Sequence, residues 1–124
     1  ESGVVIDAQV ADAFEYEASI EFDVVALIYA HMPADLRNAF HHRAVSWLRT
    51  GGTLILEGFN PSQHAFSSGG PKDATMLFDA ATIAKDFDAL QTLHLEEITT
   101  ELHEGSYHQG QAALLRYKGL KATE

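Results

Sequence analysis

Four residues whose side chains can move protons follow apolar stretches of this sequence: His31, His64, Tyr107 and His108. An imidazole is suited to act as a general base because its ordinary pKa lies near neutral pH. We therefore consider these four residues as candidates to orient or deprotonate the nucleophile of a small substrate. For His31 the competing interpretation is a histidine at the end of a strand, with its ring satisfied within the fold.

Other kinds of site are disfavoured by what the sequence lacks. It has no cysteine, which removes thiolate metal sites and thiol nucleophiles. It contains neither of the glycine-rich patterns that cradle phosphates, nor the serine elbow of the α/β hydrolases. His64, His103 and His108 could be combined into a zinc site, but their spacing on a glycine-containing turn is a weak signal, and we expect no metal.

Three further polar residues have open interpretations. His41 and His42 fall in the middle of a predicted helix, where we expect surface or interface packing rather than function. Asp12 follows an apolar stretch, so it could be a ligand-binding carboxylate or a turn residue that bonds its own backbone two residues on.

The elements that must position these residues begin with the apolar run at residues 24–28. The run is continuous rather than alternating, which is typical of a strand covered on both faces of a parallel sheet. We therefore predict a central strand at residues 22–29, preceded by a strand that ends near Asp12. A helix at residues 35–49 and a buried strand at residues 53–59 complete a right-handed βαβ unit with parallel strands.

The predicted helix has its apolar residues spaced at a helical period. Its inward face is expected to contain Leu36, Phe40, Ala44, Trp47 and Leu48. Asp35 is a candidate N-cap, and the glycines at residues 51–52 are a candidate stop, because glycine tolerates the left-handed conformation that ends helices.

The second half of the sequence predicts a long loop, a short helix and two strands. The loop covers residues 60–75, and loops of this length in a compact domain tend to be functional. A helix at residues 80–87 follows, with Ile83 and Phe87 inward. A strand on an exposed edge at residues 91–102 and a last strand at residues 111–118 are joined by a turn, so these two strands should be antiparallel.

Parallel strands would gather the candidate residues at one edge of the sheet. If the strands that end near Asp12, Tyr29, Phe59 and Leu102 are parallel, the loops after them emerge together. Open α/β sheets bind their ligands at this carboxyl edge. We therefore expect the site there.

Length and charge limit the classes of function. The 124 residues have the composition of one globular domain, so we expect a single domain at residues 1–124. The formal net charge is -10 and the eight Lys and Arg residues are scattered, which disfavours nucleic acid as a partner. No apolar run approaches the length of a membrane span and no export signal is recognisable, so we expect no membrane partner and a cytoplasmic protein.

Three segments, taken together, resemble the later motifs of the class I S-adenosylmethionine-dependent methyltransferases. They are VADAF at residues 10–14, FDVVALIYAHMP at 22–33 and LRTGGTLILEGF at 48–59. Further segments at residues 69–71, 76–78, 86–87 and 104–110 are similar to the small bacterial tellurite-resistance-like and thiopurine-methyltransferase-like members.

The resemblance implies a cofactor and residues that hold it. S-adenosylmethionine would be bound through its adenine by Asp12 and Ala13, with Phe14 beside them. The end of the next strand would line the methionine part of the cofactor, which implies Ile28, Tyr29 and His31. The family fold is a Rossmann-like α/β sheet in the order 3-2-1-4-5-7-6 with the last strand antiparallel.

The sequence departs from the family in lacking strands 1 and 2 with their glycine-rich loop and ribose-binding acidic residue. The resemblance thus implies an incomplete sheet of strands 3 to 7 that binds the cofactor poorly by itself. Losing its neighbour would leave the strand at residues 22–29 as an apolar edge, which is a template for pairing. We expect the segment ending near Asp12 to shift onto it, or a homodimer to form through it.

Two functions remain in view. The first is a methyltransferase of small molecules, for which this chain is the carboxyl-terminal part and is inactive alone. The alternative is a non-catalytic, methyltransferase-like module that self-associates or binds a protein partner.

Overall fold

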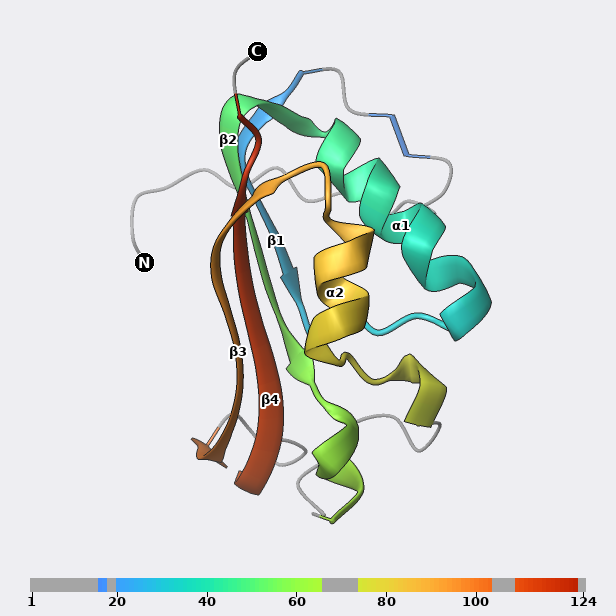
Figure 1. Ribbon diagram of the computed structural model, residues 1–124, viewed down its shortest axis with the longest axis vertical. Helices are drawn as coiled ribbons and strands as arrows, with labels where there is room; N and C mark the ends of the chain where they lie inside the picture. Colours follow the sequence, from blue (N-terminus) through green and yellow to red (C-terminus); the bar gives the residue numbers. More distant parts are fainter. Residues whose placement is uncertain (1–15, 18–19, 66–73, 104–108, 123–124) are drawn as a thin grey trace, which may run out of the picture.

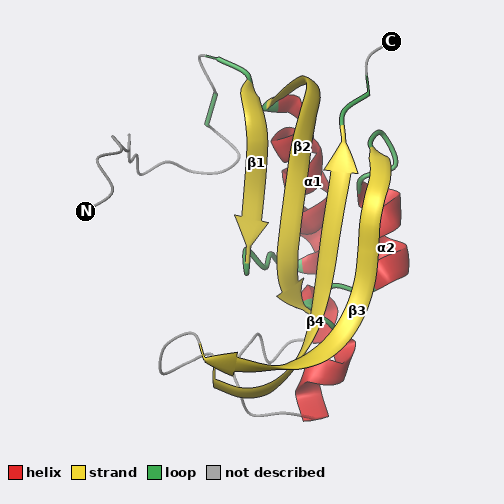
Figure 2. Cartoon of the chain, turned by 90° about the vertical axis from the view of Figure 1, so that its left-hand side faces the viewer, coloured by secondary structure: helices red, strands yellow, loops and turns green. Residues whose placement is uncertain are grey.

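The computed structural model describes residues 16–17, 20–65, 74–103 and 109–122. Its centre is a four-stranded mixed sheet in the order β1-β2-β4-β3, with both α-helices packed on one face (Figures 1 and 2). The strands are β1 (Phe22–Ile28), β2 (Leu48–Phe59), β3 (Gln91–His103) and β4 (Gln109–Leu120). The helices are α1 (Ala34–Ser46) and α2 (Ala80–Asp86), with short 3-10 turns at Pro61–Ala65 and Ala74–Met76.

The strand directions confirm the predicted topology. β1 and β2 pair in parallel across α1, as expected of a βαβ unit. β4 runs antiparallel to both β2 and β3, so β1, β2 and β3 point the same way. The hairpin of β3 and β4 is antiparallel, and β3 lies at an exposed edge, as predicted.

In the described part of the chain the strand at residues 22–29 is not central, as its apolar run predicted, but lies at the edge, as the resemblance implied. β1 lies at the edge of the sheet, and its side chains alternate between buried and exposed. Val25 and Leu27 point to the helices, while Val24 and Ile28 are 54% and 53% exposed on the other face. The continuous apolar run therefore reflects a strand with one face in the core and an apolar second face that no described residue buries.

Helix α1 differs from its prediction at both ends. It begins after Pro33, which takes the N-cap position without a side-chain hydrogen bond, and Asp35 lies in the first turn instead of capping. It ends at Ser46 with Trp47 as C-cap, and the glycines at residues 51–52 belong to β2. The Lys121 ammonium donates to the carbonyls of Val45 (3.2 Å) and Leu48 (2.9 Å), which satisfies backbone groups at this helix end.

The inward face of α1 contains one unexpected residue. Phe40 and Ala44 are buried as predicted, but Leu36 is 42% exposed and His41 is completely buried. Of the two positions expected for His41, a surface position is therefore wrong, whereas packing at an interface fits its contacts with Asp86 and Phe87.

Helix α2 agrees with its prediction. It begins with Asp79, whose carboxylate accepts the Thr82 backbone N–H at 2.8 Å, an N-cap interaction. Ile83 and Phe87 are buried. The core between the helices and the sheet is completed by side chains from β1, β2 and β4, among them Leu54, Leu56, Leu115 and Tyr117.

Several predicted segments lie outside the described residues. They are the strand ending near Asp12, residues 66–73 of the long loop and residues 104–108 of the turn.

Candidate functional site

The carboxyl ends of β1 and β2 lie side by side, because the two strands are parallel and in register up to Ile28 and Glu57. Tyr29 follows β1 with a φ of 54°, a left-handed conformation uncommon for a residue other than glycine. This turn ends the strand and carries the chain toward His31. Asn60 follows β2 at the same edge and is buried.

Both ring nitrogens of His31 bind backbone groups. Nδ1 lies 2.7 Å from the Met76 carbonyl oxygen, and Nε2 accepts the Phe59 N–H at 3.1 Å. Since a carbonyl can only accept and an N–H can only donate, the ring is neutral with its proton on Nδ1. Burial lowers the pKa of His31 below its ordinary value, although the hydrogen bond to Met76 raises it in part.

His31 also stacks within an aromatic layer. Its ring lies 4.3 Å from that of Phe78 at 13° and 5.8 Å from that of Phe59 at 15°. Gly58 makes this layer possible, because a β carbon there would overlap the Phe78 ring and lie 3.1 Å from His31 Nε2. The ring thus joins β1, β2 and the segment before α2. These contacts favour the interpretation of His31 as a satisfied strand-end histidine over its role as a base.

Tyr29 belongs to a polar chain that the sequence interpretation missed. Its hydroxyl donates to Glu57 Oε2 at 2.7 Å, and Glu57 Oε1 accepts from Arg116 Nε at 2.8 Å. Glu57 and Arg116 are directly opposed in the β2–β4 register. The opposite charges of Glu57 and Arg116 could have indicated this contact, but only to a reader who already knew which residues of β2 and β4 are paired.

Two buried amides shape the end of β2. The Asn60 side-chain amide donates to the Leu114 carbonyl at 3.0 Å, and Gln63 Oε1 accepts the Ala113 N–H at 2.9 Å. Each side chain hydrogen-bonds a backbone group of β4 near the point where β2 ends, as the backbone of a neighbouring strand would do. The sequence does not indicate these roles, since an isolated Asn or Gln in a loop carries no pattern.

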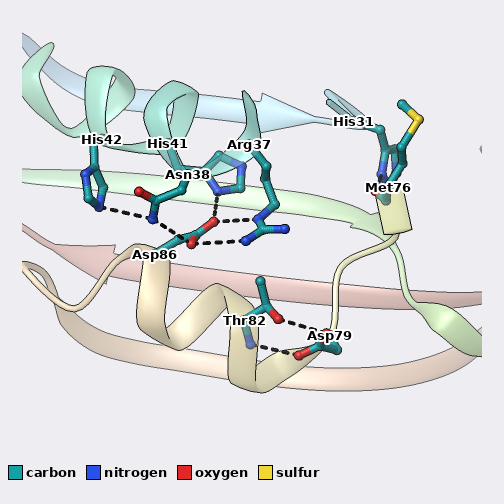
Figure 3. Close-up of polar contacts among 9 residues, drawn as sticks. All are labelled: His31, Arg37, Asn38, His41, His42, Met76, Asp79, Thr82 and Asp86. Carbon is teal, nitrogen blue, oxygen red and sulfur yellow. Dashed lines mark hydrogen bonds and ion pairs between the residues drawn. The ribbon is translucent and has the colours of Figure 1, made fainter. Parts of the chain in front are cut away.

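A polar cluster around the buried side chains of Asp86 and His41 joins the two helices behind this edge (Figure 3). The Asp86 carboxylate accepts from Arg37 Nε at 2.8 Å, Asn38 Nδ2 at 2.9 Å and His41 Nδ1 at 2.8 Å. Burial raises the pKa of Asp86, but the hydrogen bonds from Arg37, Asn38 and His41 together hold it below its ordinary value. This cluster fixes α1 on α2.

His41 is held neutral in this cluster. Burial lowers its pKa, while the neighbouring Asp86 carboxylate opposes that shift in part and the Arg37 charge adds to it. Its Nε2 is buried without a hydrogen-bond partner in the described structure, and its ring stacks on Phe87 at 4.7 Å. His41 also lies 5.8 Å from Phe78, whose other neighbour is His31. Through His41, the cluster therefore packs against the aromatic layer of His31, Phe59 and Phe78.

Of the predicted site residues, Ile28, Tyr29 and His31 lie at or just after the end of β1, with the Ile28 side chain on the exposed face and the His31 ring against Phe78. His64 lies in the 3-10 turn Pro61–Ala65 at the end of β2, but its side chain is outside the described part. The other predicted residues, Asp12, Ala13, Phe14, Tyr107 and His108, also lie outside it. Among the described residues no three carboxylate, imidazole or thiol groups lie close enough to hold a metal ion.

No protein-family model matches the sequence, and no curated protein sequence matches it. Solved structures match its fold. N-methyltransferase NodS from Bradyrhizobium japonicum WM9 is 13% identical with a TM-score of 0.58, over 89% of this chain and 57% of NodS. TehB from Haemophilus influenzae is 10% identical with a TM-score of 0.66, over 91% of this chain and 40% of TehB. A SAM-dependent methyltransferase from Methanosarcina mazei is 13% identical with a TM-score of 0.62, over 94% and 67% of the two chains.

The fold is that of the S-adenosylmethionine-dependent methyltransferases. The predicted class, an α/β sheet with an antiparallel last strand and helices packed on it, is confirmed, and the sheet of the described residues is incomplete, with four strands. The chain spans 57% of NodS and 40% of TehB. Within its described residues no helix is both long and apolar enough to cross a membrane.

Proposed function

We propose that this chain is the carboxyl-terminal part of an S-adenosylmethionine-dependent methyltransferase of small molecules. The observation that carries the proposal is the parallel β1-α1-β2 unit followed by an antiparallel hairpin, an arrangement matched in solved methyltransferases. One of these, NodS, was solved in complex with S-adenosyl-L-homocysteine. A small acceptor is favoured over nucleic acid because 18 acidic residues outnumber eight Lys and Arg, and we propose a cytoplasmic location for the protein.

The residues of the chain fit this cofactor in part. Ile28 is half exposed at the end of β1, beside the turn at Tyr29, and these two residues would contact the methionine part of the cofactor. Asp12, Ala13 and Phe14 would contact the adenine. The sequence has no glycine-rich loop to supply further backbone donors, so we expect weak binding by these 124 residues alone.

The bound cofactor supplies a methyl group on a sulfonium sulfur, and the protein must mainly position the acceptor in line with it. An acceptor that carries a proton loses it as its bond to the methyl carbon forms. His64, Tyr107 and His108 are the residues proposed to take that proton or to orient the acceptor. His31 is not proposed to take the proton, since both its ring nitrogens are bound to the backbone; it holds the ends of β1 and β2 in place instead.

Calorimetric titration of S-adenosylhomocysteine into the polypeptide as its gene encodes it tests this function. We expect saturable binding that Ile28→Asp weakens at least tenfold and that Leu93→Asp, at an exposed position on the opposite edge strand, leaves unchanged. A folded polypeptide that gives no binding heat would contradict the methyltransferase proposal.

The second candidate is a non-catalytic module that associates with itself. The observation that favours it is the position of β1, an apolar strand at the edge of the sheet. A folded protein that binds no S-adenosylhomocysteine but forms a homodimer would support this candidate over the first.

A further inference from the structure

Tyr29 is held in a backbone conformation that a large side chain seldom adopts. Its φ of 54° lies in the left-handed region, where a residue other than glycine needs support from its surroundings. Glu57 supplies that support twice, because its carbonyl accepts the Tyr29 N–H and its carboxylate accepts the Tyr29 hydroxyl, both at 2.7 Å. The Tyr29 ring also lies 5.1 Å from that of Phe59. Conformations of this kind are concentrated at ligand-binding sites.

The direction of the hydrogen bonds determines what else the Tyr29 hydroxyl can bind. The Glu57 carboxylate can only accept, so the phenol proton lies on the bond to Oε2. The other carboxylate oxygen, Oε1, accepts from Arg116 Nε at 2.8 Å. Any further hydrogen bond of the phenol oxygen must therefore be one that it accepts. The oxygen is thus suited to a donor on a ligand and not to a second acceptor.

The charges along this chain of side chains have the same consequence. The Glu57 carboxylate is in direct contact with the phenol, whereas Arg116 is bonded through the other carboxylate oxygen. A hydrogen bond given to a carboxylate polarises the O–H group and makes the phenol oxygen a stronger acceptor. A donor that carries a positive charge is therefore preferred to a neutral one.

Given the proposed methyltransferase function, on which this assignment rests, we propose that the phenol oxygen of Tyr29 binds the ammonium group of the cofactor's methionine part. Glu57 and Arg116 are the positioning residues. The methionine part carries an ammonium group, which can only donate, and a carboxylate, which can only accept. Only the ammonium group matches an oxygen that must accept and that adjoins a negative charge.

The alternative is that these three side chains only stabilise the sheet. Glu57 and Arg116 are cross-strand neighbours, and their side chains are 22% and 43% exposed. Ion pairs with this degree of exposure contribute little to stability. We therefore expect Tyr29→Phe and Glu57→Gln to fold as the unmodified protein does, which leaves ligand binding as the property that changes.

Calorimetric titration with S-adenosylhomocysteine and two of its analogues tests the assignment in the polypeptide as its gene encodes it. Tyr29→Phe should weaken binding of S-adenosylhomocysteine at least about tenfold, the factor expected for a lost hydrogen bond to a charged group. The decarboxylated analogue keeps the ammonium group and should lose affinity by the same factor. The analogue with hydrogen in place of the amino group has no such donor, so its affinity should not change.

Glu57→Gln tests the positioning role. A glutamine can donate its own N–H to the phenol oxygen, which lets the phenol proton turn toward the ligand. We expect this variant to bind S-adenosylhomocysteine more weakly and to discriminate less between it and the deaminated analogue. Tyr16→Phe is the matched control, because Tyr16 contacts Trp47 at the amino end of β1, and it should keep the affinity for every ligand.

The outcomes separate this assignment from the function on which it rests. If the unmodified protein binds S-adenosylhomocysteine but Tyr29→Phe keeps that affinity, or loses affinity equally for all three ligands, the ammonium assignment is overturned and the methyltransferase proposal stands. A folded protein that binds none of the three ligands overturns both.

Discussion

The rings of His31 and Phe78 lie 4.3 Å apart and nearly parallel, although the two residues are 47 positions apart in the sequence. The same histidine binds the Met76 carbonyl and the Phe59 N–H. One side chain therefore fixes the segment before α2 against the carboxyl ends of β1 and β2. Any function at this edge depends on that attachment.

Replacing His31 by phenylalanine should separate the hydrogen bonds from the stacking. His31→Phe keeps an aromatic ring beside Phe78 but leaves the Met76 carbonyl and the Phe59 N–H without their partner. Leaving such partly buried groups unsatisfied costs about 1–3 kcal/mol each, so we expect a loss of at least ~1 kcal/mol in the free energy of unfolding. Urea titration measures it, with His94→Phe at an exposed position as the control. Equal stability of the two variants would contradict the attachment.

Gly58 is predicted to tolerate no side chain. In Gly58→Ala the new methyl group overlaps the Phe78 ring, and overpacking of this kind costs about 1–3 kcal/mol. Shortening the ring should relieve the overlap, so Gly58→Ala combined with Phe78→Leu should lose less stability than the sum of the two single changes. A double-mutant cycle measures this coupling. Strict additivity would show that Phe78 is not what limits the position.

The Asp86 cluster is predicted to be the strongest polar contact between the helices. Asp86→Asn removes the carboxylate charge that pairs with Arg37 and accepts from His41, and breaking a largely buried ion pair costs roughly 3 kcal/mol. The neighbouring Asp88 is exposed, so Asp88→Asn is the matched control and should change stability by less than about 0.5 kcal/mol. Both values come from urea unfolding curves. A similar small effect of both changes would show that α1 and α2 are held by apolar contacts alone.

The sequence predicted most elements because their signals are local. Apolar patterns located both helices and three of the described strands to within a few residues, while β2 begins five residues before its predicted start. Asp79 satisfies an N-cap rule that concerns only the next three positions. The glycines at residues 51–52 were predicted to end the helix, but they lie in β2. Glycine also occurs in strands at positions where another backbone segment approaches closely. Gly52 is at such a position, and a β carbon there would lie 3.0 Å from the Asp23 carbonyl.

The contacts of the site depend on pairings that no local pattern contains. His41 lies one turn from both Arg37 and Ala44 and so shares the buried face of α1, a signal that was available. Its partner Asp86 lies 45 positions away. In the same way the attachment of His31 and the chain from Tyr29 to Arg116 exist only after β1, β2 and β4 have been placed. A sequence reveals that a charged side chain is buried only if the partner that neutralises it can be identified as well.

Stability should fall on mild acidification because His31 and His41 are both neutral in the fold. Burial holds the pKa of each below the ordinary value of 6.5, so the unfolded chain binds more protons than the folded chain as the pH falls through that value. Stability is then fully present above about pH 6.5 and declines below it. The Asp86 carboxylate, whose pKa is also below its ordinary value, adds a further loss only below about pH 4.

Urea midpoints between pH 7.5 and 5 measure this dependence. A protonated His31 would turn an Nε2–H toward the Phe59 N–H, and a protonated His41 would bury an Nε2–H that has no acceptor among the described residues. We therefore expect the midpoint to decrease with pH, and His31→Phe to remove the part of the slope that His31 contributes. His94→Phe, at an exposed position, should keep the full slope. A midpoint that is constant across this range would contradict the neutral assignment of both rings.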